Sequence, residues 1–393
     1  MTYIPAVAPA LTHVPSLRQP LQLSASSVNR WLTCPRQYFY ENRLRVQRPL
    51  ETGPDFGNWV HQVFAEWMHR YSLAPDPISH FAPPALLAVG MEALHTPTDA
   101  WAYSPWGIVQ RQTPLTLLDW QTQWQACVRD LTTQGFFARR PLCMLPEYGI
   151  SLELTPPDTL LPALQHAFAA LSISGVRVTG RIDALWAFDT PQGIVWWVLD
   201  LKTSAATHTS QKSETRQAHL AAALEPLPVL PPSDNDALPV LDRAALQTGS
   251  ALALRQYQLP FYALAVWQDA RLQAAMASAI DKVLPKITPS PLTPPVLETL
   301  ALQYVRTPAD SKGIGSIQVA LPVERLQQAL PGLLADLWQH VVLPIAQADA
   351  TSQTLSAFPV MPGKACDLCV FALACEGPSL ATEDTLVEDA ADD

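Results

Sequence analysis

The spacing of apolar residues predicts a series of amphipathic helices. A short helix should begin after Ser24, whose side chain can cap it, and end at Cys34-Pro35, because its apolar residues recur three and four positions apart. Other segments have a continuous apolar face at helical spacing. These further helices are expected over residues 58–71, 115–132, 159–171, 252–277 and 322–345.

Alternating apolar and polar residues predict strands in the middle of the chain, over residues 148–154 and 176–188. Each should have one buried and one polar face. Residues 194–201 are apolar nearly throughout, which is typical of a central strand covered on both faces. The turn-forming residues 189–193 precede this strand, so we expect an antiparallel hairpin that is symmetric about residues 191–192.

The 38 prolines divide the chain into short elements rather than into separate domains. We expect a disordered leader over residues 1–23, one folded domain over residues 24–376 and an acidic tail over residues 377–393. Two segments, at about residues 73–115 and 203–250, are rich in proline or polar residues and are expected to be irregular insertions.

Charge and hydropathy limit the expected location and partners. The formal net charge is −10, and six acidic residues without a base lie in residues 380–393, so the remainder has −10 + 6 = −4. This balance gives little long-range attraction for nucleic acid. The N-terminal residues lack the basic start and apolar core of a secretory signal. No run of 18 uninterrupted apolar residues is present, so we expect a cytoplasmic protein without a membrane span.

Three charged residues should meet at the end of the hairpin. The symmetric register sets Asp183 opposite Asp200, and alternation along the strand sets Lys202 on the same face as Asp200. Adjacent carboxylates repel each other unless a cation neutralises them, and Mg²⁺ or Mn²⁺ prefers such oxygen ligands. A metal beside a lysine suits phosphodiester hydrolysis. The alternative is an ordinary Asp–Lys pair at a strand end.

The segments Gly180-Arg-Ile-Asp183 and Val198-Leu-Asp200-Leu-Lys202 resemble the active-site hairpin of the RecB, AddB and CRISPR-adaptation nucleases. The same families have an earlier Gly-x-x-x-His and a later Gln-x-x-x-Tyr, which this chain matches with His61 and with Gln258 and Tyr262. The matched motifs lie in the family order, between residues 24 and 376.

The resemblance implies an α/β fold with a PD-(D/E)xK restriction-endonuclease-like core, in which helices flank a mixed central sheet. It implies catalytic roles for Asp183, Asp200 and Lys202, and it makes Gln258 and Tyr262 groups that position the substrate or the lysine. By the same resemblance, the metal ligands are His61, Asp183, Asp200 and Leu201. The sequence departs from the pattern at Ile182, where the superfamily name has proline, and in the long segment between Lys202 and Gln258.

The cysteines predict a second metal site. Cys366, Cys369 and Cys375 follow the spacing C-x2-C-x5-C, and Cys34 lies far upstream. Four thiolates suit either tetrahedral zinc or an iron–sulfur cluster, and the spacing leaves both open. The resemblance implies a 4Fe–4S cluster that joins the N- and C-terminal segments, with zinc as the less expected alternative. Cys127 and Cys143 are expected to be buried as small apolar residues.

Together, these features predict a metal-dependent DNA nuclease, an exonuclease acting in repair or recombination. The sequence has no G-x-x-x-x-G-K-[ST] phosphate-binding loop, so the ATP-driven helicase that the resemblance implies is expected to be a separate chain. One alternative is a catalytically silent subunit that binds DNA ends or acts as a scaffold in a helicase–nuclease complex. Another is a nuclease of the CRISPR-adaptation type.

Overall fold

The structure is a computed structural model that describes most of the chain between residues 21 and 375. The described residues are 21–46, 56–74, 77–95, 114–158, 160, 162–202, 224–230, 240–242, 257–284, 295–305, 318–351, 357–361, 366, 369, 371 and 375. The predicted acidic tail and most of the predicted leader lie outside these residues.

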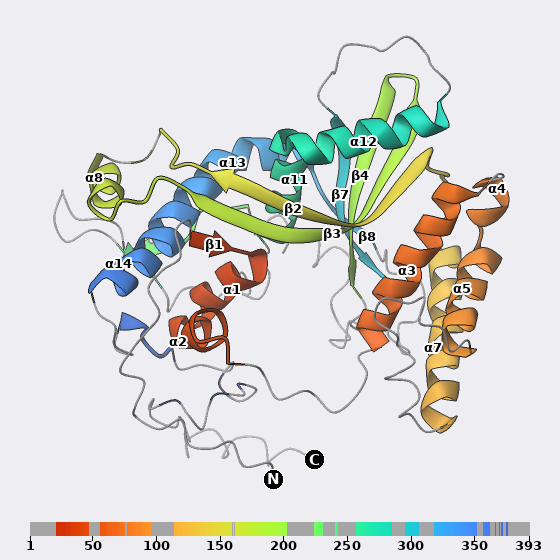
Figure 1. The fold of residues 1–393 in the computed structure, drawn as a ribbon, viewed down its shortest axis with the longest axis horizontal. Coiled ribbons are helices and arrows are strands. Elements are labelled where there is room, and N and C mark those ends of the chain that lie inside the picture. The colour runs from red at the N-terminus through yellow and green to blue at the C-terminus, as the bar shows by residue number, and fades with distance from the viewer. Residues whose placement is uncertain are drawn as a thin grey trace, which may run out of the picture.

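A mixed six-stranded sheet forms the centre of the fold, and its longest strand is β3 (Figure 1). β2 pairs antiparallel with one edge of β3. The other edge of β3 has two partners: β1 pairs in parallel with the start of β3, and β4 pairs antiparallel with its end. β7 follows, parallel to β4, and β8 is antiparallel to β7. The strands are β1 (Leu21–Leu23), β2 (Cys143–Leu154), β3 (Val176–Thr190), β4 (Gly193–Lys202), β7 (Val296–Tyr304) and β8 (Gln318–Leu321).

Helices cover both faces of the sheet and form two separate cores with it. The first core contains residues of α1 (Ala25–Thr33), α11 (Gln258–Gln268), α12 (Ala270–Val283) and α13 (Val323–Leu337). The second core contains residues of α3 (Phe56–Leu73), α5 (Pro83–His95) and α7 (Pro114–Thr133), which stand together at one end of the sheet (Figure 1). The remaining helices are α2 (Pro35–Tyr38), α4 (Pro77–His80), α8 (Pro162–Ala170), α14 (Leu343–Thr351) and the π-helices η1 (Phe39–Arg43) and η3 (Trp338–Val342). The predicted α/β fold, a mixed sheet flanked by helices, is confirmed.

The predicted capping and hairpin geometry are confirmed. The Ser24 side chain accepts a hydrogen bond from the backbone N–H of Ser27, and α1 ends at Cys34, although α2 starts directly afterwards. The β3–β4 pairs run from Ala184 opposite Leu199 to the end of the hairpin at Thr190 and Gly193, which is the symmetric register. The helices predicted over residues 58–71, 115–132, 159–171 and 322–345 are present as α3, α7, α8 and the run from α13 into α14.

Some secondary-structure predictions were wrong. Residues 77–80 and 83–95 are helical, because paired prolines are tolerated in the first turn of α5 and apolar residues follow at helical spacing. The single helix expected over residues 252–277 is two helices, and Asp269 separates them by accepting hydrogen bonds at the start of α12. Strands β7 and β8 were not predicted.

The leader and the second insertion also contain ordered elements. Residues 21–23 pair with β3 instead of belonging to a disordered leader. Within residues 203–250, β5 (Val229–Leu230) pairs with β6 (Val240–Leu241). Leu227 is buried in the first core, and its backbone N–H donates to Asp336 of α13. Part of this predicted insertion is therefore anchored on the domain.

The apolar row of β3 changes face in the middle of the strand. Val178 and Ile182 belong to the first core, whereas Ala184 and Trp186 belong to the second. The prediction of one buried face along the whole strand is therefore wrong. The α3 layer covers the second face only from residue 184 onwards, so the end of β3 is buried on both faces and its beginning on one. β2 changes face at the same level, at Glu147, whose φ of 49° lies in the left-handed region.

One helical run bears on the expectation that no segment could span a membrane. Among the described residues, Val323–Ala348 is long and apolar enough to cross a membrane by length and composition alone, so the exclusion on length was wrong. Half of an 18-residue apolar window within this run is buried, and Leu326, Leu333 and Trp338 lie in the first core. A core helix of this length passes the same test, so the run is weak evidence for a span.

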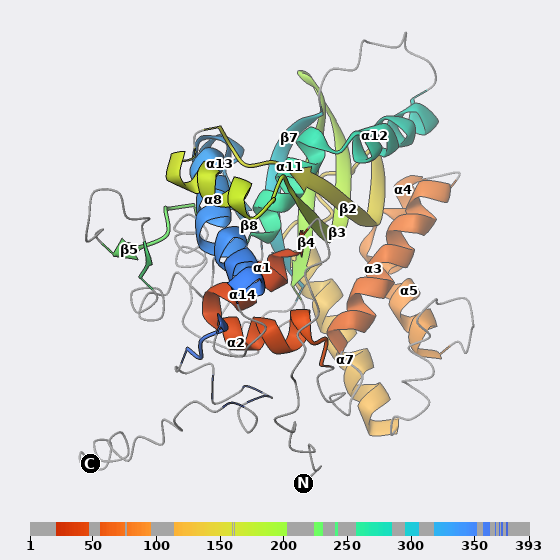
Figure 2. The ribbon, with the colours of Figure 1, turned by 60° about the vertical axis from the view of Figure 1, so that its left-hand side comes forward.

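The N-terminal helices pack against the C-terminal end of the described chain. α1 lies beside η3, which leads into α14 (Figure 2). The Trp31 indole donates to the carbonyl of His340, and Arg36 Nε donates to the carbonyl of Phe358 over 2.8 Å. The rings of Tyr40 and Phe371 stack with centroids 5.0 Å apart. Segments more than 300 residues apart are thus held together on the side of the first core.

The close approach of α5 and α7 generates a stability prediction. A Cβ atom at Gly90 would lie 2.0 Å from Nε1 of Trp124, a fully buried side chain. Gly90→Ala should therefore lower the free energy of unfolding by about 1–3 kcal/mol, because the indole must move within a packed core. Chemical denaturation would measure the change.

A matched control is Gly332→Ala in α13, where an added Cβ meets nothing within 4 Å. This change should raise stability by about 0.5–1 kcal/mol, since alanine is the better helix former. A Gly90→Ala variant as stable as the wild type would contradict the observed packing.

Candidate active site

Asp183 stands where the two strands of the hairpin separate. The last backbone pair is Ala184 with Leu199, and beyond it the Leu201 N–H donates to Asp183 Oδ2 over 2.8 Å. A side-chain carboxylate thus replaces the next rung of the ladder. The Leu201 side chain is buried in the second core, so Leu201 can serve the site only through its backbone.

Three side chains from three elements form a group that could hold a metal ion. His61 of α3 has Nδ1 3.4 Å from Asp183 Oδ1 and 3.8 Å from Glu147 Oε1. One ligand atom from each of the three residues lies within 4.8 Å of the other two. Two carboxylates and an imidazole suit a hard or borderline divalent cation.

Glu147 belongs to this group but was not predicted. The β2–β3 register pairs Pro146 with Ala184 and Tyr148 with Ile182, so Glu147 lies opposite Asp183. Its positive φ is uncommon for a residue with a side chain and is typical of functional sites. The acidic residue just before the predicted strand 148–154 was the available signal. It could not be used, because the sequence does not show which strand pairs with the other edge of β3.

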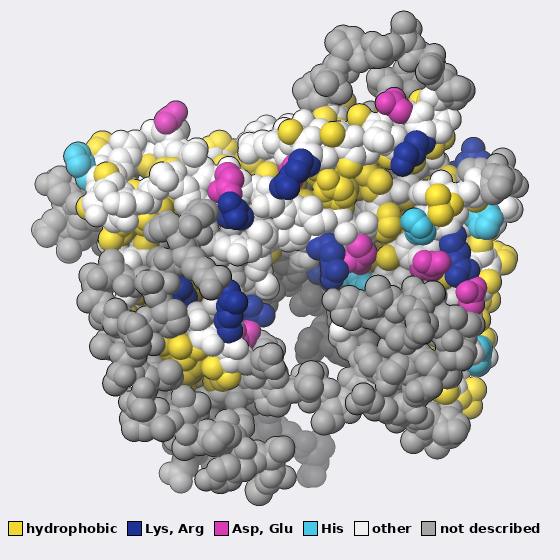
Figure 3. Space-filling view, in the orientation of Figure 1, with side chains coloured by type: hydrophobic (Ala, Val, Ile, Leu, Met, Phe, Trp, Pro, Cys, Tyr) yellow, Lys and Arg dark blue, Asp and Glu magenta, His cyan; other side chains and the backbone are white. Residues whose placement is uncertain are grey.

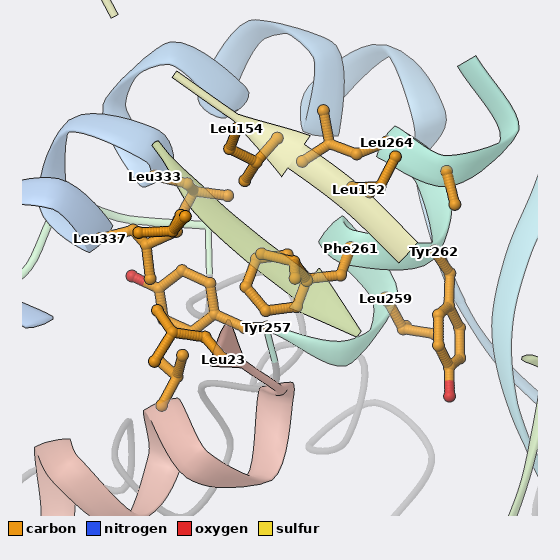
Figure 4. Packing of buried hydrophobic residues seen from close by; sticks show 14 of the residues in the cluster. Leu23, Leu152, Leu154, Tyr257, Leu259, Phe261, Tyr262, Leu264, Leu333 and Leu337 are labelled. Atoms are coloured by element: carbon orange, nitrogen blue, oxygen red, sulfur yellow. The ribbon is translucent and has the colours of Figure 1, made fainter. Parts of the chain in front are cut away.

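A second group surrounds Asp200 on the side of the first core. Lys202 Nζ forms an ion pair with Asp200 Oδ2, and Gln258 Nε2 donates to Asp200 Oδ1 over 2.6 Å. Lys202 also donates to Gln258 Oε1 at 3.3 Å. The Gln258 amide lies 2.8 Å from the Tyr262 hydroxyl, which donates to the carbonyl of Arg181. In close-up, the Tyr262 hydroxyl points away from the other labelled core side chains (Figure 4).

The carboxylates perturb the pKa values around them. Burial raises the pKa of Asp200, which is 1% exposed, to about 6; the Lys202 charge opposes this rise and the Asp183 charge adds to it. Burial would lower the pKa of His61, but hydrogen bonds and charge from Asp183 and Glu147 outweigh burial and raise it to about 9. Burial also raises the pKa of Tyr262. His61 must therefore lose a proton before it can bind a metal.

All the predicted hairpin and helix residues meet beside the middle of β3, where β4 ends. Their grouping differs from the expected one, because Asp200 is not in the close group of His61, Glu147 and Asp183 among the described residues. Asp183 contacts α3 on the second-core side, whereas Asp200 contacts α11 on the first-core side. The role assigned to each residue stays a prediction.

The sequence matches the PD-(D/E)XK nuclease superfamily over residues 22–225, just over half of the 393-residue chain. The chain therefore belongs to this superfamily, whose nucleases generally use divalent metals. The matched range includes His61, Glu147, Asp183, Asp200 and Lys202, so the metal-binding group lies within the family domain. A comparison with curated proteins finds no match.

The ionisation of His61 generates a pH prediction for the metal-free protein. Its pKa rises from 6.5 to about 9 on folding, so the stabilisation is fully present below pH 6.5 and is lost as the pH rises through about 9. In EDTA, the melting temperature of the wild type should fall across this window. In His61→Gln the fall should be smaller.

A suitable control is His69→Gln, which changes an exposed histidine of the same helix. It should keep the wild-type pH profile. An identical pH profile in His61→Gln would contradict the proposed contacts with Asp183 and Glu147.

Proposed function

We propose that this chain is a divalent-metal-dependent DNA nuclease of the RecB/AddB type, an exonuclease acting in repair or recombination. The observation that supports this most directly is the group of His61, Glu147 and Asp183 beside the Asp200–Lys202 ion pair. Two carboxylates and a histidine supply the kinds of ligand that a divalent cation accepts. A fixed ammonium next to it suits a reaction in which negative charge develops on a phosphoryl group.

The residues divide into those that hold a cation and those that hold the lysine. When bound, a divalent cation would polarise the phosphodiester and lower the pKa of an attacking water. His61, Glu147 and Asp183 would bind it, and Asp200 supplies a third carboxylate nearby. Because Leu201 N–H occupies Asp183 Oδ2, the other oxygen, which faces His61, is the one available to the cation.

Lys202 is held in position by two acceptors from different elements. Asp200 balances its charge, and Gln258 accepts a hydrogen bond from it while donating to Asp200. Tyr262 fixes Gln258 in turn. This arrangement restricts the ammonium to a small volume, where it can orient water or stabilise the transition-state charge.

Cleavage of end-labelled single- and double-stranded DNA with Mg²⁺ or Mn²⁺ tests the proposal. Asp183→Asn and Lys202→Met should each lower the rate by at least about 10²-fold, since each removes a charge aimed at the reaction centre. Asp189→Asn provides the control, because Asp189 is an exposed acidic residue of the same strand, beside the hairpin turn. It should keep wild-type activity.

Circular dichroism should show an unchanged fold in all three variants. Full activity in Asp183→Asn or Lys202→Met would refute the assignment of the site. Activity of the wild type on RNA alone would refute the substrate class.

We further propose that Cys34, Cys366, Cys369 and Cys375 hold a 4Fe–4S cluster. Burial is the first cause of the raised pKa of the Cys369 thiol; a backbone hydrogen bond with Phe371 opposes the rise, and the charges of Cys34, Cys366 and Cys375 add to it. No three sulfur atoms among the described cysteines lie within 4.8 Å of one another. Four thiolates suit either tetrahedral zinc or a 4Fe–4S cluster, and the resemblance to the RecB and AddB nucleases favours the cluster.

Metal content distinguishes these cofactors. Protein purified without oxygen should contain iron and acid-labile sulfide near four per chain. Cys34→Ala should lose the metal and melt at a lower temperature, because the cluster would join the packed N- and C-terminal segments. Cys127→Ala, a change at a buried cysteine of the second core, should retain the iron. Stoichiometric zinc without iron in the wild type would exclude the cluster.

A separate ATP-dependent helicase is the partner that fits this proposal. The resemblance to RecB and AddB supports such a partner, and the net charge of −10 gives the chain little long-range attraction for DNA. A motor that holds the strand would raise the local concentration of phosphodiester at the site. A silent scaffold subunit is disfavoured, since Asp183, Asp200 and Lys202 are all present and Lys202 pairs with Asp200.

A further inference from the structure

Beyond Asp183, one face of β2 and β3 has exposed polar side chains. Residues two apart on a strand share a face, so Arg177, Thr179, Arg181 and Asp183 form one row along β3. Arg177 and Arg181 are exposed. Gly149 of β2 lies opposite Arg181, and a Cβ added there would meet nothing within 4 Å. The row therefore leads from open surface to the carboxylate of the active site.

Arg181 is fixed at both its backbone and its side chain by residues of the active site. Its carbonyl accepts a hydrogen bond from the Tyr262 hydroxyl. Its Nε lies 2.7 Å from Glu147 Oε2, while the other oxygen of Glu147 faces His61. On the face of the molecule that Figure 3 shows, basic, acidic and histidine side chains adjoin near the middle.

The guanidinium keeps donors for a second anion. Its side chain is 65% exposed although it is paired with Glu147. A guanidinium has five N–H donors, and a single carboxylate takes at most two of them. The remaining donors form a fork that matches the geometry of a phosphate group.

The geometry points to Arg181 as a residue that binds a phosphate of the substrate strand beside the scissile phosphodiester, with Glu147 as its positioning residue. This inference rests on the proposed nuclease function and adds a substrate contact to it. Arg181 and Asp183 are about 7 Å apart along the strand, a spacing that neighbouring phosphates of a nucleic-acid strand can span. The Glu147 carboxylate then links the cation site to the bound strand.

The same strands offer a matched control. Arg177 Nε pairs with Glu153 Oε1 at 2.5 Å, and both side chains are exposed. This pair has the same chemistry on the same two strands, about 13 Å from Arg181. An exposed ion pair of this kind contributes little to stability, so both arginines can be replaced without unfolding the protein.

DNA binding measured at several salt concentrations tests the inference. A Lys202→Met background with Mg²⁺ keeps the cation ligands and is expected to bind without cleavage, so fluorescence anisotropy with a labelled oligonucleotide gives the affinity. Adding Arg181→Ala should weaken binding about tenfold and reduce the salt slope by about 1. Arg181→Lys should restore the slope but not the full affinity, and Arg177→Ala should leave both unchanged.

Kinetics in the otherwise wild-type protein provide an independent measurement. Arg181→Ala should raise KM and leave kcat within about twofold, because a contact to a neighbouring phosphate is made equally before and during the reaction. A selective fall in kcat would overturn the assignment.

The inference also fails if Arg181→Ala binds DNA like its parent, or if Arg177→Ala shows an equal loss. The proposed function fails separately, by absence of cleavage in the wild type with Mg²⁺ or Mn²⁺. DNA binding remains measurable in that case.

Discussion

The burial of two carboxylates at the end of one hairpin is the constraint on which the rest of the structure depends. A buried charge without partners is costly, so each carboxylate needs donors from its surroundings. Asp183 obtains them from the Leu201 backbone and from His61 on one side of the sheet. Asp200 obtains them from Lys202 and, on the other side, from Gln258. Both helical layers are therefore needed to neutralise the site, and neither half of the fold can supply it alone.

The two sets of donors lie on opposite sides of the sheet. The buried apolar residues of β2 and β3 move from one side of the sheet to the other at Glu147 and Asp183, which lie opposite each other. Beside the first half of β3 the sheet has one buried face; beside the second half, toward the hairpin turn, the α3 layer covers the second face as well. Asp183 and Glu147 lie at the boundary, where a cation could reach them from the exposed side. The site thus occupies the edge of a helix layer rather than a cavity within a core.

Much of this arrangement could be predicted from the sequence, and the exceptions have physical reasons. Period-2 alternation and turn residues predicted the hairpin register that sets Asp183 near Asp200, because both are local features. Glu147 was missed because its position depends on β2 pairing with β3, a contact that no local pattern encodes. The helix α5 was missed because its prolines indicate irregular structure, although prolines are tolerated in a first turn. The change of face in β3 was missed because its apolar residues keep alternating with the same spacing on both sides of the change. The sequence pattern therefore gives no sign of it.

The packing of Trp31 on the carbonyl of His340, and of Arg36 on that of Phe358, has a consequence for synthesis of the chain. The first helices emerge from the ribosome long before their partners exist. Their contacts with η3 and Phe358 can form only after more than 300 further residues have been translated. Contacts of such high sequence separation form slowly. Closure of the N-terminal helices onto the C-terminal segment is therefore expected to be a late step in folding.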